Sequence, residues 1–226
     1  EYCYLRGAYP SANLVIFVNI EEVFAQTDLL LSEGPVYLCN SYETDLPAID
    51  HFTGFVKSWV DFASQRSSLT LEIRTKSAAL DHIRDISPSA NIILAWSVSP
   101  AATAKRHERS APPPKSRLDA MKRALDRGWR VRLCIDPVIY SQNWRSEYEE
   151  LAELVRGTVD ISKLDSVSIG AFRVPAASIK RMRAADPGSV IAAFPFEKTG
   201  KKGICKYPDE LEKEMIKHVQ EKLYGK

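Results

Sequence analysis

The sequence lacks the short motifs that mark several common classes of enzyme. No GxGxxG follows an apolar run and no GxxxxGK[ST] occurs, which disfavours the usual dinucleotide and P-loop nucleotide sites. No GxSxG nucleophile elbow is present, which disfavours a serine hydrolase. The four histidines lack the spacing of metal ligands: His51, His82, His107 and His218.

Cysteine is scarce and widely spaced. The four cysteines, Cys3, Cys39, Cys134 and Cys205, form no CxxC pair, so neither a disulfide framework nor a zinc ribbon is expected. Cys134 lies in an apolar run and is expected to be a small core residue. No apolar run approaches the roughly 20 residues of a membrane span, and no secretory signal is recognisable. We therefore expect a cytoplasmic protein without a membrane contact, and the start at Glu1 predicts that an upstream part is missing.

Composition and charge are those of an ordinary globular protein. The chain has 226 residues, 45% of them hydrophobic and 27% charged, which suits a single domain with a substantial core. The net charge is only +2, but basic residues gather in two places. They could contact phosphates or simply face solvent, and both readings stay open. The two groups are Lys180, Arg181 and Arg183, and Lys198, Lys201, Lys202 and Lys206.

Apolar, strand-like runs alternate with helical patterns about six times, which favours a parallel α/β sheet. Periodicity does not distinguish an open sheet from a full or partial barrel. Strands are expected at residues 13–20, 35–39, 69–75, 91–98, 129–135 and 166–172, with 190–194 as a candidate last strand. Helices are expected at 21–32, 49–63, 77–84, 116–127, 145–155, 175–185 and 208–223, and a proline-containing loop at 105–115.

Polar side chains follow several of the expected strands. The carboxyl ends of parallel strands are where α/β proteins bind their ligands. Such residues could hold an anionic or zwitterionic ligand, or could simply mark where strands run into loops. The set comprises Cys39, Tyr42, Thr75, Lys76, Ser97, Ser99, Asp136 and Arg173.

Short segments, from Tyr2-Cys3-Tyr4-Leu5 near the start to Gly203-Ile204-Cys205-Lys206-Tyr207 near the end, resemble in order the spore photoproduct lyase family of radical S-adenosylmethionine enzymes. The first, Tyr2-Cys3-Tyr4-Leu5, resembles the end of the CxxxCxxC motif that binds an iron–sulfur cluster. The resemblance continues along almost the whole chain. The matching segments are residues 18–26 (VNIEEVFAQ), 49–53 (IDHFT), 75–76 (TK), 96–99 (WSVS), 117–118 (RL), 136–137 (DP) with Trp144 and Tyr148, 172–173 (FR) and 203–207 (GICKY).

This resemblance implies the fold and the cofactors. It implies a partial, open (β/α)6 TIM-like barrel of parallel strands. Residues 1–226 would form a single radical S-adenosylmethionine core domain that lacks its N-terminal part. Cys3 would be the third thiolate of a [4Fe–4S] cluster, whose open iron binds S-adenosylmethionine. The residues that would orient S-adenosylmethionine are Thr75, Lys76, Ser97 and Ser99.

The resemblance also implies an activity. A 5′-deoxyadenosyl radical would initiate repair of a UV-induced, methylene-bridged thymine dimer in DNA, with electrons from a donor such as ferredoxin or flavodoxin. Tyr2 and Tyr4 would relay hydrogen, or alternatively pack around the cluster. The lesion and its phosphodiester would be held by Arg173, Lys201, Lys202, Lys206 and Tyr207. Holding one cluster ligand of three, this chain alone is expected to be inactive.

One position departs from the family pattern. Tyr42 occupies the place of the cysteine that returns a hydrogen atom to the repaired thymine, and Cys39 lies three residues earlier. Both stay candidates for that role. Two other functions also remain: a radical enzyme of the same family with another substrate, and a non-catalytic α/β protein that has lost its cluster.

Overall fold

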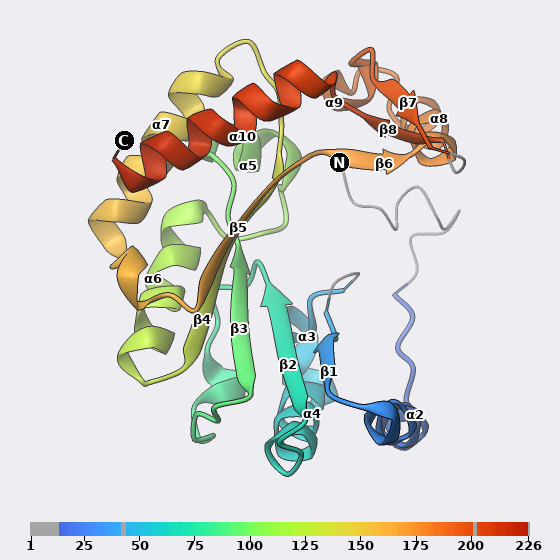
Figure 1. The fold of residues 1–226 in the computed structure, drawn as a ribbon, viewed down its shortest axis with the longest axis vertical. Coiled ribbons are helices and arrows are strands. Elements are labelled where there is room, and N and C mark those ends of the chain that lie inside the picture. Colours follow the sequence, from blue (N-terminus) through green and yellow to red (C-terminus); the bar gives the residue numbers. More distant parts are fainter. Residues whose placement is uncertain (1–13, 42–43, 201–202, 226) are drawn as a thin grey trace.

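The computed structural model describes residues 14–41, 44–200 and 203–225. Five parallel strands form one curled sheet with the order β1-β2-β3-β4-β5 (Figure 1). The open parallel half-barrel expected from the sequence is thereby confirmed. The strands are β1 (Val36–Cys39), β2 (Leu69–Thr75), β3 (Ile92–Ser97), β4 (Arg130–Val138) and β5 (Ser166–Ala171).

Two predicted strands are wrong: the one at residues 13–20 and the candidate strand at 190–194. The described chain therefore has five parallel strands instead of about six. Residues 14–19 have no regular structure, and Phe17 and Val18 are exposed. A strand needs a neighbour for its backbone hydrogen bonds, and none of the described strands pairs with this apolar run. Val190–Ala193 forms the short helix α9, because the Ser189 hydroxyl accepts a hydrogen bond from Ala192 N and so caps it.

Helices join β1 to β2, β3 to β4 and β4 to β5, whereas only a 3-10 turn lies between β2 and β3. The helices are α2 (Ile20–Glu33), α3 (Leu46–Thr53), α4 (Phe55–Ser64), α5 (Ala101–His107), α6 (Pro114–Asp126), α7 (Trp144–Thr158), α8 (Ala176–Ala185), α9 (Val190–Ala193) and α10 (Asp209–Tyr224), with short 3-10 turns at Asp81–Ile83 and Ile161–Lys163.

Some helix boundaries differ from those expected. The single helix expected at 49–63 is divided at Gly54, whose φ of 63° is left-handed and ends α3. The helix expected at 77–84 is only the turn Asp81–Ile83. The loop expected at 105–115 is partly helical, since α5 extends through His107 and Pro114 is the first residue of α6, where its missing N–H costs nothing.

The two faces of the parallel sheet differ in chemistry. Leu71, Ile73 and Trp96 point toward the helices and are almost fully buried. The alternate residues of the same strands point to the concave face. Glu72 and Arg74 lie there next to Ile93 and Ala95 of β3, so β2 places charged groups inside the half-barrel.

A second, antiparallel sheet has the order β6-β8-β7 and lies beyond the carboxyl ends of the parallel strands (Figure 1). An aromatic cluster of Tyr140, Phe194, Phe196 and Tyr207 joins it to the loop after β4. From there α10 returns along α7 and β5 (Figure 1). The strands are β6 (Arg173–Pro175), β7 (Glu197–Thr199) and β8 (Ile204–Lys206).

Candidate functional site at the carboxyl ends of the strands

Asp45 fixes the carboxyl end of β2. Its carboxylate accepts hydrogen bonds from the Thr75 hydroxyl at 2.6 Å and from Lys76 N at 2.8 Å. It also accepts one from Ala48 N at 3.2 Å and so caps α3. The Thr75 oxygen in turn accepts a hydrogen bond from Ser77 N at 2.8 Å. Thr75 is therefore hydrogen-bonded within the protein, next to Lys76 at the end of the strand.

A buried carboxylate organises the polar residues beyond β2 and β3. The Glu108 side chain is 3% exposed, and its Oε1 lies 3.2 Å from Lys76 Nζ. The Ser99 hydroxyl donates to the same oxygen at 3.0 Å, and the guanidinium of Arg117 pairs with Glu108 Oε2 at 2.5 Å. Arg117 is fully buried and also donates to the carbonyl of Ser97 at 3.1 Å. We call these five residues, Lys76, Ser97, Ser99, Glu108 and Arg117, the Glu108 cluster.

The charges of the Glu108 cluster do not cancel. Lys76 and Arg117 are cations and Glu108 is the one carboxylate among the five residues. These five residues carry two positive charges and one negative charge, in a largely buried setting where a charge interacts more strongly than in water. Lys76 is its most exposed charged member, with 32% of its side chain exposed. This arrangement suits a carboxylate or phosphate placed next to Lys76.

A second polar network lies deeper on the concave face, around Glu72. This carboxylate is 1% exposed and lies 2.8 Å from Arg74 and 2.9 Å from Arg132. Tyr37 donates a short hydrogen bond to it, and Cys39 Sγ lies 3.6 Å from its Oε1. Burial alone would raise the pKa of Glu72, but the Tyr37 hydrogen bond and the two arginines together lower it. Glu72 is thus a carboxylate at neutral pH.

The same network keeps its two acidic neighbours protonated. Burial, reinforced by the Glu72 charge, raises the pKa of the Cys39 thiol to about 11. Burial and the hydrogen bond to Glu72 raise the pKa of Tyr37 to about 12. Cys39 pairs in register with Glu72, three residues before Thr75 on the neighbouring strand. It therefore lies on the concave face but below the Glu108 cluster.

Arg173 and Asp136 meet at the ends of β4 and β5. Their side chains approach to 3.7 Å, and Arg173 also donates to the carbonyl of Ala171 at 3.2 Å. Just over half of the Arg173 side chain is exposed, 54%. Gly170 makes room for the carboxylate, because a Cβ at this position would lie 3.0 Å from Asp136 Cγ. Arg173 can thus contact a ligand above the sheet.

The other residues expected to bind substrate are more enclosed. Lys206 forms ion pairs with Asp209 and Glu212 at the start of α10. Tyr207 is 1% exposed, and its hydroxyl accepts a hydrogen bond from Tyr140 N at 2.9 Å. Burial raises the pKa of Tyr207 to about 12.

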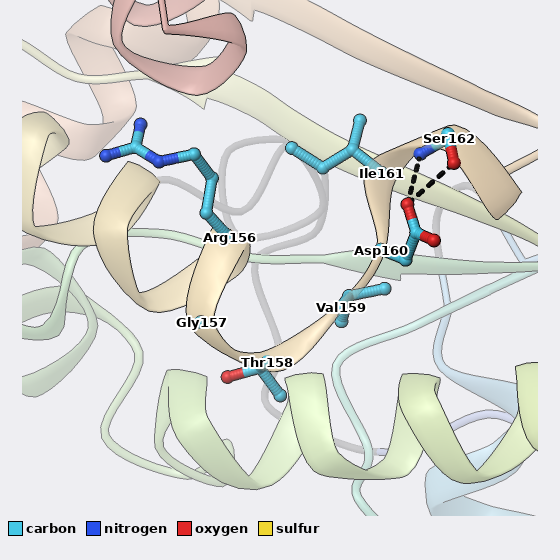
Figure 2. Close-up of a pocket in the computed structure, with 7 residues that line it drawn as sticks. All are labelled: Arg156, Gly157, Thr158, Val159, Asp160, Ile161 and Ser162. Carbon is cyan, nitrogen blue, oxygen red and sulfur yellow. Dashed lines mark hydrogen bonds between the residues drawn. The ribbon is translucent and has the colours of Figure 1, made fainter.

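A shallow depression near the opposite end of the sheet offers no comparable chemistry. It is formed by residues 156–162, at the turn after α7 (Figure 2). The carboxylate of Asp160 accepts hydrogen bonds from the backbone and hydroxyl of Ser162, and Arg156 points away from it (Figure 2). The turn therefore satisfies its own polar groups.

The sequence matches one known protein family along almost its whole length. A model of the spore photoproduct lyase family matches residues 1–224. The chain belongs to the spore photoproduct lyase family. The resemblance seen in the short segments is thereby confirmed.

Curated members of the spore photoproduct lyase family are distant relatives. The spore photoproduct lyase of Geobacillus sp. is 25% identical over 172 residues, which cover 73% of this chain and 50% of the relative. That of Bacillus subtilis is 24% identical over 157 residues, or 68% of this chain and 46% of the relative. The chain thus spans about half the length of these relatives.

Solved spore photoproduct lyases share the fold. One in complex with dinucleoside spore photoproduct has a TM-score of 0.84 at 19% identity, covering 99% of this chain and 69% of that chain. A mutant with bound AdoMet and dinucleoside spore photoproduct has the same TM-score and coverage at 20% identity. At this identity the likeness supports the fold.

Some residues that the family resemblance singles out lie outside the described part of the chain. They are Tyr2, Cys3, Tyr4, Tyr42, Lys201 and Lys202. Within residues 14–41, 44–200 and 203–225, no group of three or more His, Cys, Asp or Glu side chains is placed to hold a metal ion. No helix in these ranges is long and apolar enough to cross a membrane. Cys134 is buried, as expected.

Sequence reasoning gave no role to five residues of the site. Asp45 could have been recognised as a helix cap, since Leu-Pro follows it. Glu72 and Arg74 lie two apart in an apolar strand, which puts both on one face. Glu108 is the single acid in the basic run 105–109. Arg117 had no local signal of its buried position.

Proposed function

We propose that this protein is an enzyme that repairs a methylene-bridged thymine dimer in DNA, with S-adenosylmethionine and a [4Fe–4S] cluster as cofactors. The observation that carries the proposal is the Glu108 cluster at the carboxyl ends of a parallel half-barrel, in a chain of the spore photoproduct lyase family. The proposal includes a single catalytic-core domain, a cytoplasmic location and a small electron-donor protein such as ferredoxin or flavodoxin as partner.

The residues present suit S-adenosylmethionine. Its methionyl end has a carboxylate, which suits the partly exposed ammonium group of Lys76. Glu108 and Ser99 hold Lys76 and the loop beyond β3 in place, while Ser97 faces the ligand side. Thr75 acts through Asp45 by fixing the strand end. Cys3 would be a cluster thiolate, and together the two cofactors would supply a carbon-centred radical.

The substrate end of the site would be held by the small sheet. Arg173 is exposed beside Asp136 and suits a phosphodiester oxygen. Lys201, Lys202 and Lys206 would add positive charge at the hairpin, and Tyr207 would support the hairpin from beneath. Base-flipping enzymes need such a platform to hold an extruded nucleotide.

Return of hydrogen to the product would involve tyrosine or cysteine side chains. Only a protonated thiol can give up a hydrogen atom, and the raised pKa keeps Cys39 in that form at neutral pH. The position of Cys39 below the Glu108 cluster argues against it as the donor. Tyr42, which occupies the place of the family's cysteine in the sequence, is the favoured donor. Tyr2 and Tyr4 would continue the relay.

The proposal is tested with the full-length protein, prepared anaerobically with a reconstituted cluster. A dinucleotide containing the bridged dimer should be converted to the unbridged dinucleotide. Cys3→Ala should abolish the electron paramagnetic signal of the cluster, because one of three thiolates is lost. Failure of the wild-type protein to convert the lesion would reject the proposed substrate.

Lys76 provides a separate test of the cofactor site. Lys76→Ala should weaken S-adenosylmethionine binding about tenfold to a hundredfold, the usual effect of losing one charge-assisted hydrogen bond. Lys57→Ala removes a cation from the outer helix α4 and is the matched control. Equal affinities for the two variants in a calorimetric titration would remove Lys76 from the site.

A related enzyme with another substrate is the second candidate. The observation that favours it is Tyr42 in the position of the family's hydrogen-donating cysteine. In that case the cluster signal should respond to S-adenosylmethionine while the bridged dimer is left unchanged. Tyr42→Cys would then restore no repair activity, whereas under the first proposal it should still support repair.

A further inference from the structure

A separate cavity lies beside the Glu108 cluster. Its volume is about 560 Å³, and it is formed by α5, the loop after β4, the start of α7 and α9 with Tyr207. Pockets for small organic ligands commonly measure about 300–1,000 Å³. The cavity is therefore large enough for one nucleotide.

Its position links it to the carboxyl ends of the parallel strands. One wall is α5, which begins soon after β3 ends, and another is the loop that begins where β4 ends. Within α5 and its end, His107 lines the cavity, while the next residue, Glu108, pairs with Lys76. The cavity and the proposed cofactor site are thus neighbours on opposite sides of one short segment.

The inner wall of the cavity is aromatic and apolar. Tyr140 and Phe194 meet edge to face with their ring centroids 5.4 Å apart, and Tyr140 is 38% exposed. Ile139 and Ile191 are buried beside them. A flat heteroaromatic ring stacks well on an exposed tyrosine, and such stacking tolerates any base.

The rim supplies polar groups of two kinds. Glu147 lies on α7 within reach of the Thr103 hydroxyl, at 3.4 Å, and could accept hydrogen bonds from the N–H groups of a base. Gln142 and Asn143 add amide donors and acceptors. Arg106 is exposed at the rim, where its guanidinium suits a phosphate oxygen.

We propose that this cavity binds one nucleotide of single-stranded DNA next to the lesion, with the base against Tyr140 and the phosphate at Arg106. The proposal rests on the proposed function, because it takes DNA as the substrate. It adds a flanking subsite that shares Tyr207, but neither Arg173 nor Lys206, with the residues assigned to the lesion. Lys105 and Arg109, which are near Arg106 in the sequence and exposed, add positive charge along which a strand could continue.

Fluorescence anisotropy with the full-length protein and labelled, undamaged oligothymidylates tests the subsite. Arg106→Gln should weaken binding of a long oligomer about fivefold to tenfold and reduce the salt slope by about one. Binding of a thymidine dinucleotide, which fills the lesion site alone, should not change. Lys163→Gln, at the opposite end of the sheet, removes the same charge and should change neither.

A second variant fills the cavity instead of removing a contact. Ala193 is exposed and lines the cavity, so Ala193→Glu adds bulk and a negative charge there without disturbing the core. Ala184→Glu makes the same change on the exposed face of α8 and is the matched control. Only Ala193→Glu should weaken binding of the long oligomer. The midpoints of thermal unfolding of both variants should match that of the wild type.

The outcomes separate this proposal from the proposed function. If Arg106→Gln and Ala193→Glu bind the long oligomer as the wild type does, the subsite is rejected even where repair is observed. If the two variants also bind the dinucleotide more weakly, the cavity belongs to the lesion site and its assignment as a flanking subsite is wrong. If they weaken the long oligomer but no lesion is repaired, the subsite stands and the repair function fails.

Discussion

At the scale of single residues, Glu72 links more side chains of the concave face than its place in an apolar strand suggests. Its carboxylate contacts Tyr37, Cys39, Arg74 and Arg132, which come from β1, β2 and β4. A carboxylate so deeply buried is stable only because two cations and a hydroxyl neutralise and solvate it. The chemistry of its neighbours therefore depends on Glu72.

The pKa of the Cys39 thiol is one property that depends on Glu72 and can be measured. Its pKa of about 11 leaves about a hundredfold less thiolate than an ordinary cysteine at the same pH below 9. Iodoacetamide should thus label Cys39 slowly until the solution is strongly alkaline. Glu72→Gln removes a negative charge and should lower the Cys39 pKa, which the pH profile of labelling, read by peptide mass spectrometry, would show. The exposed-site variant Glu33→Gln should leave the profile unchanged, and a Glu72→Gln profile identical to that of the wild type would contradict this account.

Gly170 and Asp136 form a second pair that can be tested residue by residue. A methyl group at position 170 would lie within about 3.0–3.1 Å of the Asp136 carboxylate. Gly170→Ala should therefore destabilise the fold by about 1–3 kcal/mol, the usual cost of overpacking. In an Asp136→Ala background the same change should cost much less. Urea unfolding of the four proteins gives this coupling, and additive effects would show that the carboxylate does not need the space.

At the scale of elements, two glycines in helical regions should respond oppositely to the same substitution. Gly54 has a φ of 63° between α3 and α4, so Gly54→Ala should lower the free energy of unfolding by about 1 kcal/mol. Gly157 lies within α7, and a Cβ at this position would meet nothing within 4 Å. Gly157→Ala should therefore raise the free energy of unfolding by up to about 1 kcal/mol. Urea midpoints measure both effects. Stabilisation by Gly54→Ala would mean that the two helices can join into the one expected from the sequence.

At the scale of the whole molecule, acid should unfold the protein partly through Glu72. Its pKa is lowered in the folded state, so its contribution is complete above the unfolded value of about 4.3 and is lost as the pH falls through the lower folded value. At pH 7, Glu72→Gln should cost about 3 kcal/mol, because two arginines lose their buried partner. The difference from the wild type should narrow as the pH falls below about 4. A constant difference in urea unfolding at every pH would show that Glu72 is not ionised in the fold.

The sequence by itself determined the parallel sheet and much of the strand-end chemistry. Five strands were predicted within a few residues, because apolar runs bounded by polar turns form strands that are buried between helices and a partner strand. Lys76, Ser97 and Ser99 were singled out because the carboxyl ends of such strands converge. The order of short motifs was enough to indicate the family. These features depend on local pattern, which a sequence displays directly.

Only the tertiary structure decided which residues become partners. Glu108 and Lys76 are in contact although they lie 32 residues apart in the sequence, and Cys39 and Glu72 lie 33 residues apart. No local pattern in the sequence indicates such contacts. The apolar run 14–19 looked like a strand, yet none of the described strands pairs with it and it has no regular structure. Periodicity shows that a segment can be buried, but hydrogen-bond and charge partners depend on where distant segments meet in space.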